Sequence, residues 1–380
     1  MRFNNVCVDA ISYVLPDDAV TSAQVESRLA PLYRRLGLPC GVLEGMSGIR
    51  SRRFWPPGTM PSEISMRSAE MVMDAAQVDR STIGALVHGS ICRDFVEPAT
   101  ACLVHRGLGL SSKCVVYDVS NACLGLLNGM LQVATMIELG QIEMGIVCGT
   151  ESTRDVVDHT IDLLNADLSL TRARINNVFA ALTFGSASAA VLLAHRRRSK
   201  TGTRLLGATL EAYSEGALRS HTDLDSSITG KVPRLLEVDS AGLLEEGISA
   251  TADNFRSFLL ELDWSRRSIE RTICHQVGAR ACRMLIDALG VAKGRECFTF
   301  EEYGNTGAVA IPLTLAHTTE RSEPPPGSQI ALVGTGAGIN SLAMAIEWQG
   351  TATAMSAPAE TSGFCRQPES GGIRSVDEAT

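Results

Sequence analysis

Cys123 is the residue of this sequence best placed to act as a nucleophile, because of the pattern on either side of it. Residues 115–119 (VVYDV) are typical of a strand, and residues 124–139 have the apolar spacing of a helix. The thiol is therefore expected at the start of a helix, where unpaired N–H groups and the helix dipole favour a thiolate. A small buried residue in a tight strand–helix turn is the competing interpretation, and this context alone leaves both open.

A thiol nucleophile also needs a base and a group that holds negative charge on oxygen. His275 directly follows a strand-like segment, residues 269–274, and Asn305 lies in the Gly-flanked turn EYGNTG after residues 297–300. Polar groups at the carboxyl ends of strands are where α/β sheets gather ligands. A lone His or Asn is more often structural. Their shared placement favours a site with Cys123.

The elements that must position these residues alternate between strands and helices, which indicates an α/β fold. Strands are predicted at residues 83–88, 115–119, 144–148 and 187–194, and again at 269–274, 297–300, 329–333 and 342–348. Residues 146–151 (IVCGTE) and 331–336 (ALVGTG) end their strands alike, which suggests two similar halves. We expect the halves at residues 1–200 and 201–349. Residues 350–380 have few large apolar residues and are expected to be a disordered tail.

Composition excludes several functional classes. The net charge of −8 argues against nucleic-acid binding. No apolar run approaches the roughly 18 residues that span a bilayer, and no signal peptide is evident, so a cytoplasmic protein is expected. The 11 cysteines contain no CxxC pair, so they are expected to be reduced thiols rather than metal ligands. Neither a metal nor another cofactor is predicted.

Taken together, the motifs resemble those of β-ketoacyl synthase III enzymes in the thiolase superfamily. Residues 118–130 (DVSNACLGLLNGM) resemble the nucleophile motif, 275–280 (HQVGAR) the HQANxR motif, and 304–312 (GNTGAVAIP) the GNTSAASVP-like motif. Residues 47–53 and 334–338 fit the flanking motifs, and the order holds from about residue 3 to residue 348. Residues 93–101 (RDFVEPATA) and the HQV variant are more similar to OleA, the branch that joins two acyl-CoAs head to head.

This resemblance implies the five-layer αβαβα thiolase fold, built from two similar halves and working as a homodimer. Cys123 would attack an acyl-CoA thioester and become acylated. His275 and Asn305 would hydrogen-bond the carbonyl of the second thioester and stabilise its enolate. The backbone N–H groups of Cys123 and Ala337 would form the oxyanion hole of the acyl-enzyme.

Further roles follow from the same resemblance. Glu97 matches the glutamate that enters the partner's site as the base for the α-proton; a carboxylate paired with Arg93 is the plainer alternative. Arg280 keeps a basic position near the entrance and could meet a phosphate. The residues that grip the CoA adenine in the initiation enzyme are replaced by Val42 and Met46, so CoA and acyl carrier protein both stay open as carriers.

The resulting hypothesis is a non-decarboxylative Claisen condensation of two fatty acyl-CoAs to a 2-alkyl-3-oxoacid. A decarboxylative β-ketoacyl synthase III that uses malonyl-ACP is the first alternative. An acyltransferase of specialised metabolism is the second, and a subunit that has lost catalysis is the third. A downstream enzyme that processes the β-ketoacid is an expected partner.

Overall fold

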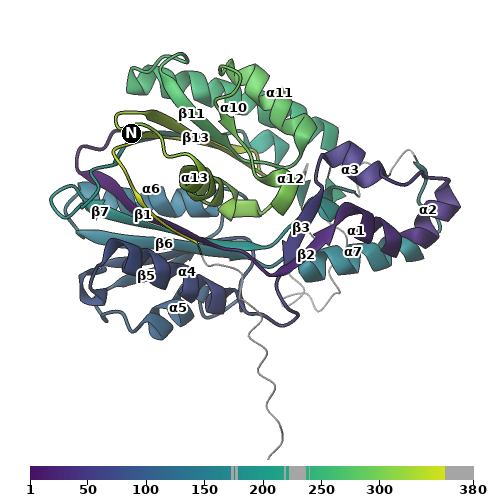
Figure 1. Cartoon of the computed structure of the whole chain (residues 1–380), viewed down its shortest axis with the longest axis horizontal. Coiled ribbons are helices and arrows are strands. Elements are labelled where there is room, and N and C mark those ends of the chain that lie inside the picture. The colour runs from purple at the N-terminus through teal and green to yellow at the C-terminus, as the bar shows by residue number, and fades with distance from the viewer. Residues whose placement is uncertain (173–174, 176–178, 218–219, 222–236, 239, 356–380) are drawn as a thin grey trace, which may run out of the picture.

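The computed structural model describes residues 1–172, 175, 179–217, 220–221, 237–238 and 240–355. A body of layered sheets and helices carries a smaller lobe that projects to one side (Figure 1). Within the described ranges, no helix has both the length and the apolar character that crossing a membrane would require.

Among the residues that the structure describes, the first half of the chain contains seven strands and seven α-helices. In chain order they are β1 (Val6–Val14), β2 (Asp18–Thr21), α1 (Ser22–Arg28), α2 (Ala30–Leu36), α3 (Val42–Ser47), β3 (Ser51–Phe54), α4 (Pro61–Ala76), β4 (Ala85–Gly89), α5 (Thr100–Leu108), β5 (Val115–Val119), α6 (Gly125–Glu138), β6 (Met144–Glu151), α7 (Arg154–Ala166) and β7 (Ala187–His195). Short 3₁₀ turns lie at η1 (Arg80–Thr82) and η3 (Ala180–Thr183).

The second half repeats the alternation with fewer interruptions. Its elements are β8 (Arg204–Ala212), η4 (Ser214–Gly216), β9 (Ser220–His221), β10 (Glu237–Val238), α10 (Ser240–Leu262), β11 (Ile269–Cys274), α11 (Ala279–Leu289), β12 (Glu296–Cys297), α12 (Phe300–Tyr303), η5 (Gly307–Val309), α13 (Ala310–Arg321), β13 (Gln329–Gly336), β14 (Asn340–Glu347) and β15 (Ala352–Met355).

The strands show that the two halves share one topology. The main sheet runs β12-β11-β13-β14-β8 and then β1-β7-β6-β4-β5, and the two runs meet where Cys7 of β1 pairs with Arg204 of β8. In each run the three strands farthest from this junction are parallel to one another (β4, β5 and β6, and β11, β12 and β13). The two strands of each run that lie nearest the junction (β14 and β8, and β1 and β7) are antiparallel to their neighbours within the run. The mixed α/β class expected from the alternation is confirmed.

Helices cover both faces of each run of strands (Figure 1). The first-half strands present alternate residues to opposite sides, so Val147 packs toward α6 whereas Ile146 and Cys148 pack toward α4 and α5. Helices α6 and α13 lie between the two runs, and α10 and α11 cover the outer side of the second. The largest apolar cluster is therefore at the centre, around α6 and α13.

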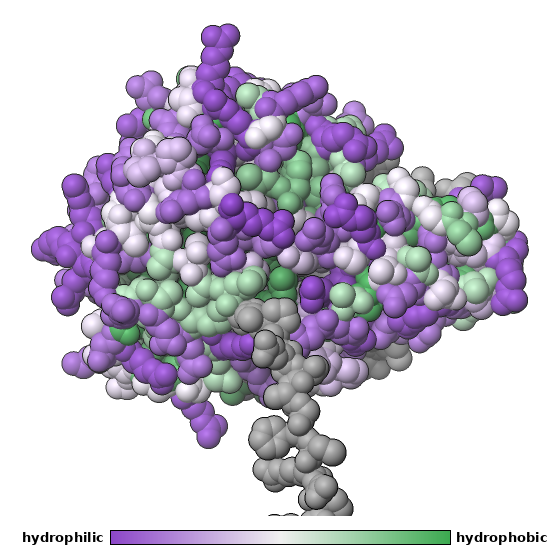
Figure 2. All heavy atoms as spheres, viewed as in Figure 1, coloured by the Kyte–Doolittle hydropathy of each residue, from purple (hydrophilic) through white to green (hydrophobic). Residues whose placement is uncertain are grey.

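The lobe is formed by short elements between β1 and α4 together with α7, and has an apolar cluster of its own. Figure 2 shows it as a projection whose outer surface carries many polar side chains. Thr183 and Phe184 lead from this lobe back to the body, where Phe184 forms a parallel bridge with Asn305. The lobe therefore adjoins the turn that carries Asn305.

Several sequence predictions need correction. Residues 298–300 are not strand, because the chain leaves the sheet after Cys297 and enters α12. Pro312 lies in the first turn of α13, where its missing N–H has no partner to lose. The prediction of a disordered tail from residue 350 is wrong for Ala352–Met355, which pair with β1 in parallel. Residues 356–380 lie outside the described residues.

Candidate active site

Cys123 lies in a tight turn between β5 and α6, as expected. The turn is unusual because Ala122 adopts a φ of 45°, in the left-handed region that residues with a Cβ rarely enter. Asn121 fixes the turn from both sides: its Nδ2 donates to Asn128 on α6, and its Oδ1 accepts from Asn340 on β14. The start of α6 packs closely against the backbone of β4. A Cβ added to Gly89 would lie only 2.5 Å from the Gly125 carbonyl oxygen.

The Cys123 thiol is held in its neutral form in this structure. Its pKa is raised to about 12, chiefly by burial and in addition by the Glu151 carboxylate, while the thiol's own backbone N–H acts in the opposite sense. This direction is opposite to the effect expected from the helix start, because removing the sulfur from solvent disfavours the thiolate.

His275 follows β11 and is buried, with its backbone N–H bonded to the Val333 carbonyl of β13. Neither ring nitrogen has a hydrogen-bond partner among the described residues. Burial lowers its pKa to about 4, so the ring is neutral and keeps one N–H to donate. An unpartnered, buried donor is costly unless a ligand satisfies it.

Asn305 is buried in the turn between α12 and η5 and is tied into the structure by its backbone. Its N–H donates to the Thr183 carbonyl, and its carbonyl accepts from Gly185. Its side-chain Oδ1 accepts from the backbone N–H of Gly307 at 3.1 Å. This bond identifies the oxygen, so the Nδ2 group is the end of the side chain that can donate to a substrate carbonyl.

Ala337 lies in the hairpin turn between β13 and β14, which packs against the Cys123 turn. A Cβ on Gly336 would lie 3.1 Å from Leu124 Cγ and 3.5 Å from the Asn121 carbonyl oxygen. On the next strand, Asn340 donates to Asn121. The structure thus places the Ala337 turn beside the turn of Cys123.

Glu97 and Arg280 are exposed, whereas His275 and Asn305 are buried and Cys123 and Ala337 are partly buried. Glu97 is in the loop between β4 and α5, near the exposed Ile91, Phe95 and Val96. Within the described ranges it forms no salt bridge, so the alternative pairing with Arg93 is not seen. Arg280 is in the first turn of α11.

Glu151, the last residue of β6, is not among the site residues predicted from the sequence. Its side chain is 1% exposed, and the backbone N–H groups of Ile91, Cys92 and Ala308 donate to it. Burial raises its pKa in spite of these bonds. The signal was a carboxylate at the end of an otherwise apolar strand, a position where a charged residue needs a reason.

The buried residues come together where the two halves meet. Glu151 acts electrostatically on Cys123 and binds the turn that carries Asn305. His275 is bonded to β13, whose Gly334 packs on Leu124, the residue after the nucleophile. These elements carry the Asn305 amide, whose orientation is defined, the unpartnered imidazole of His275 and the thiol of Cys123. Such a set of groups suits acyl transfer.

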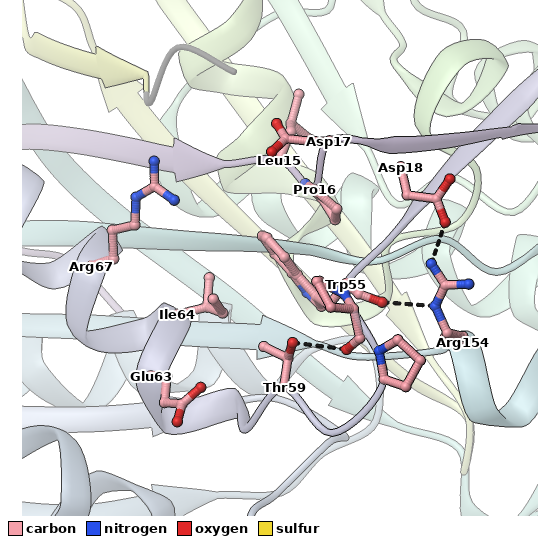
Figure 3. A pocket seen from close by; sticks show the side chains of 12 residues that line it. Leu15, Pro16, Asp17, Asp18, Trp55, Thr59, Glu63, Ile64, Arg67 and Arg154 are labelled. Atoms are coloured by element: carbon pink, nitrogen blue, oxygen red, sulfur yellow. Dashed lines mark hydrogen bonds and ion pairs between the residues drawn. The ribbon is translucent and has the colours of Figure 1, made fainter. Parts of the chain in front are cut away.

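A surface cavity of about 650 Å³ lies close to this site but is not lined by the three residues. Figure 3 shows Trp55 and Arg154 in its wall, with Arg154 bonded to Asp18 and to the Trp55 carbonyl. The indole N–H of Trp55 donates to the Glu151 carbonyl at 3.0 Å. The cavity wall therefore supports the end of β6.

Comparisons with known proteins agree with this geometry. Residues 56–223 match the family described as thiolase, N-terminal domain, and residues 259–348 match 3-oxoacyl-[acyl-carrier-protein (ACP)] synthase III C terminal. The acyl-CoA:acyl-CoA alkyltransferase of Shewanella oneidensis is 35% identical, over 92% of this chain and 100% of that protein. The chain belongs to the OleA family of the thiolase superfamily. The alkyltransferase of Xanthomonas campestris is 30% identical with the same coverage.

Solved structures place the chain with OleA and its relatives in three dimensions. Cerulenin-bound Xanthomonas campestris OleA superimposes with a TM-score of 0.86 at 29% identity, covering 92% of this chain and 98% of that one. A structure described as 3-oxoacyl-(acyl carrier protein) synthase III from Xanthomonas oryzae has a TM-score of 0.85 at 30% identity, covering 92% and 100%. Thiolase-superfamily acyltransferases are thus the group to which this chain is similar over nearly its whole length.

Proposed function

We propose that this protein condenses two fatty acyl-CoAs head to head into a 2-alkyl-3-oxoacid. The observation that supports the proposal is a pair of side-chain donors, on His275 and Asn305, carried by elements of the second half that pack against the end of β6 and the start of α6 in the first half. The His275 ring has no partner among the described residues, and the Asn305 amide is turned so that its NH₂ is the donor. Two donors that converge on one carbonyl oxygen stabilise an enolate, which a Claisen condensation requires.

The reaction begins on the sulfur of Cys123. The thiol loses its proton as it attacks the first thioester carbonyl, CoA leaves as a thiol, and an acyl-enzyme remains. The backbone N–H groups of Cys123 and Ala337 are proposed to hold the oxyanion of this step. The turn geometry supports that pairing, since Gly336 packs directly on the residues beside the nucleophile.

The second acyl-CoA supplies the new carbon–carbon bond. A base removes its α-proton, the enolate oxygen is held by His275 and Asn305, and the enolate carbon attacks the acyl-enzyme. Cys123 leaves as a thiolate and is reprotonated. The β-ketoacyl-CoA that results is hydrolysed by water to the 2-alkyl-3-oxoacid and free CoA.

The proposed base is Glu97 of a second copy of the chain in a homodimer. The loop that holds it exposes Phe95 (49%) and Val96 (59%), which is a large exposure for neighbouring apolar side chains. The adjacent strand β5 is the edge of the main sheet, and Val115 on it is also exposed. An apolar loop beside an open strand edge favours pairing with another copy.

The finer architecture belongs to the same proposal. Two halves, residues 1–200 and 201–349, would form the five-layer αβαβα thiolase fold, and the matching strand order of the two runs supports this. The boundary falls between β7 and β8. Arg280, exposed at the start of α11, is proposed to meet a phosphate of the carrier.

A decarboxylative β-ketoacyl synthase III that uses malonyl-ACP is the second candidate. It is favoured by the synthase III structure from Xanthomonas oryzae, which superimposes as well as OleA does. Such an enzyme obtains its carbanion by loss of CO₂ and needs no base for an α-proton. The two candidates therefore differ in what Glu97 is for.

Incubation with a long-chain acyl-CoA as the sole substrate tests the proposal. We expect free CoA, a 2-alkyl-3-oxoacid or its decarboxylated ketone, and an acyl adduct on Cys123 in intact-protein and peptide mass spectra. Cys123→Ala should lose the adduct and the product, while Cys40→Ser, at an exposed cysteine elsewhere, should keep both. Strict dependence on malonyl-ACP would establish the second candidate instead.

A further inference from the structure

Glu151 is a buried carboxylate that the proposed chemistry leaves without a task. It is 1% exposed, and the described residues provide no cation to pair with it. Its oxygens instead accept three backbone N–H groups, from Ile91 at 3.1 Å, Cys92 at 3.3 Å and Ala308 at 3.1 Å. Burying a carboxylate without a counter-charge is costly, so three aligned donors at this position indicate a role that a neutral residue would not fill.

The donors come from both halves of the molecule. Ile91 and Cys92 follow β4 in the first half, whereas Ala308 belongs to the turn that carries Asn305 in the second. The contact with that turn is close: a Cβ on Gly307 would lie 2.9 Å from Glu151 Oε1. Gly307 in turn donates to the Asn305 side chain. A continuous path of bonded atoms therefore runs from Glu151 to the Asn305 amide.

We propose that Glu151 is a positioning residue, which fixes the Asn305 amide against the nucleophile's half and places a negative charge beside Cys123. This inference rests on the proposed function, because it takes Cys123 as the nucleophile and Asn305 as a donor to substrate. Glu151 itself touches neither substrate nor the reacting atoms and acts through the turn and through its field.

The electrostatics of the neighbouring thiols support the assignment. At both Cys123 and Cys92, burial raises the pKa of the thiol most, and the charge of Glu151 raises it second most. Asp155 adds a smaller effect of the same sign at Cys92. The resting thiol is thus kept protonated, and forming the neutral thioester removes the repulsion that a thiolate would meet.

The test compares Glu151→Gln with Glu151→Asp in the full chain. Iodoacetamide, which alkylates the thiolate, is the probe, and modification of Cys123 is followed by peptide mass spectrometry at pH 8. Gln removes the charge, so Cys123 should be alkylated faster than in the wild type, by about five-fold or more. Asp keeps the charge, and its Cys123 should react within about two-fold of the wild-type rate.

Condensation should change in the opposite sense. A Gln side chain keeps one acceptor oxygen, so it can accept from Ile91 and Ala308 only by turning its NH₂ group toward the Cys92 N–H. Its neutral oxygen also holds the Ala308 N–H, and with it the Asn305 turn, more weakly than a carboxylate does. We expect condensation by Glu151→Gln to fall by about ten-fold or more even though its thiol is more reactive. Glu26→Gln is the matched control, since Glu26 is also buried and accepts from the backbone N–H groups of Gly41 and Leu43, but in the lobe. Its Cys123 alkylation should equal that of the wild type.

The outcomes distinguish failure of the role of Glu151 from failure of the proposed function. Alkylation of Glu151→Gln at or below the wild-type rate, in protein that melts cooperatively, overturns the role of Glu151. If Glu151→Gln does not fold, Glu151→Asp decides the question. Alkylation of its Cys123 at about the wild-type rate, together with impaired condensation, supports the role of Glu151. Alkylation clearly faster than in the wild type opposes it. If wild-type Cys123 is never acylated by acyl-CoA, the proposed function fails, whereas the alkylation comparison still reports on the field of Glu151.

Discussion

At Cys123, two physical effects oppose each other, and the weaker one is the easier to see in a sequence. A helix start favours negative charge by typically 0.3–1 kcal/mol. Removing a thiolate from water costs more, and here burial and the nearby Glu151 raise the pKa of Cys123 to about 12. We therefore expect the thiol to be protonated before it attacks a thioester.

His275 should matter for the second half-reaction more than for the first. In His275→Ala the enolate loses one of its two side-chain donors, while the Cys123 thiol and its turn are unchanged. We expect acylation of Cys123 to stay within about ten-fold of the wild type and condensation to fall by roughly 10²–10³. Single-turnover acylation followed by mass spectrometry, beside steady-state product formation, separates the two. Equal losses in both would contradict this division of labour.

The buried histidines should make stability depend on pH. Burial lowers the pKa values of His88 and His275 to about 4, below the usual 6.5. At His88, Asp118 and Asp94 oppose this effect and Arg93 adds to it. Between pH 4 and 6.5 these two histidines bind more protons in the unfolded chain than in the folded one. Their contribution to the free energy of unfolding therefore rises with pH over this range and is constant above it.

Urea denaturation at pH 5 and pH 8 measures this dependence. We expect the wild type to lose on the order of 2 kcal/mol per buried histidine at the lower pH. His88→Gln, which cannot titrate, should be less stable at pH 8, because its bond to Ser65 changes, but should show a smaller pH difference. A pH difference equal to that of the wild type would argue against His88 as a source.

Among the elements, the connection between β5 and α6 contains backbone strain beside the nucleophile. Ala122 has a φ of 45°, which costs a residue with a Cβ roughly 1–2 kcal/mol. Ala122→Gly should be nearly neutral in stability, because relief of strain offsets the greater freedom of the unfolded chain. Ala122→Val should destabilise by about 2 kcal/mol or more. Urea midpoints check both, and equal stability of the two variants would exclude strain here.

Strands that are bounded by turn-forming residues could be predicted from the sequence. The site residues that directly follow such strands could be predicted with them. The strands at residues 115–119 and 269–274 have the predicted bounds, and Cys123 and His275 follow them as expected. The lobe could not be read in this way, because helices as short as α1, α2 and α3 show too few turns for a period. Glu151 was missed because its partners, such as Ala308, are brought to it only by the packing of the halves.

At the scale of the whole molecule, the proposed dimer predicts complementation between inactive variants. Cys123→Ala lacks the nucleophile, and Glu97→Ala lacks the base that it would lend to its partner. A heterodimer of the two contains one site with an intact Cys123 and an intact Glu97 from the other copy. Co-expression should therefore restore condensation in the mixed species. No recovery in isolated heterodimers would place the base within its own chain.

The site is completed by contacts between halves that are far apart in the chain: Glu151 binds Ala308, and Phe184 bridges Asn305. During synthesis on a ribosome, the thiol therefore emerges long before its two donors have been translated. A nascent chain of the first half has a sulfur but no means of holding an enolate. Condensation can begin only after the second half has been released and has docked, so an unfinished polypeptide cannot make free β-ketoacid.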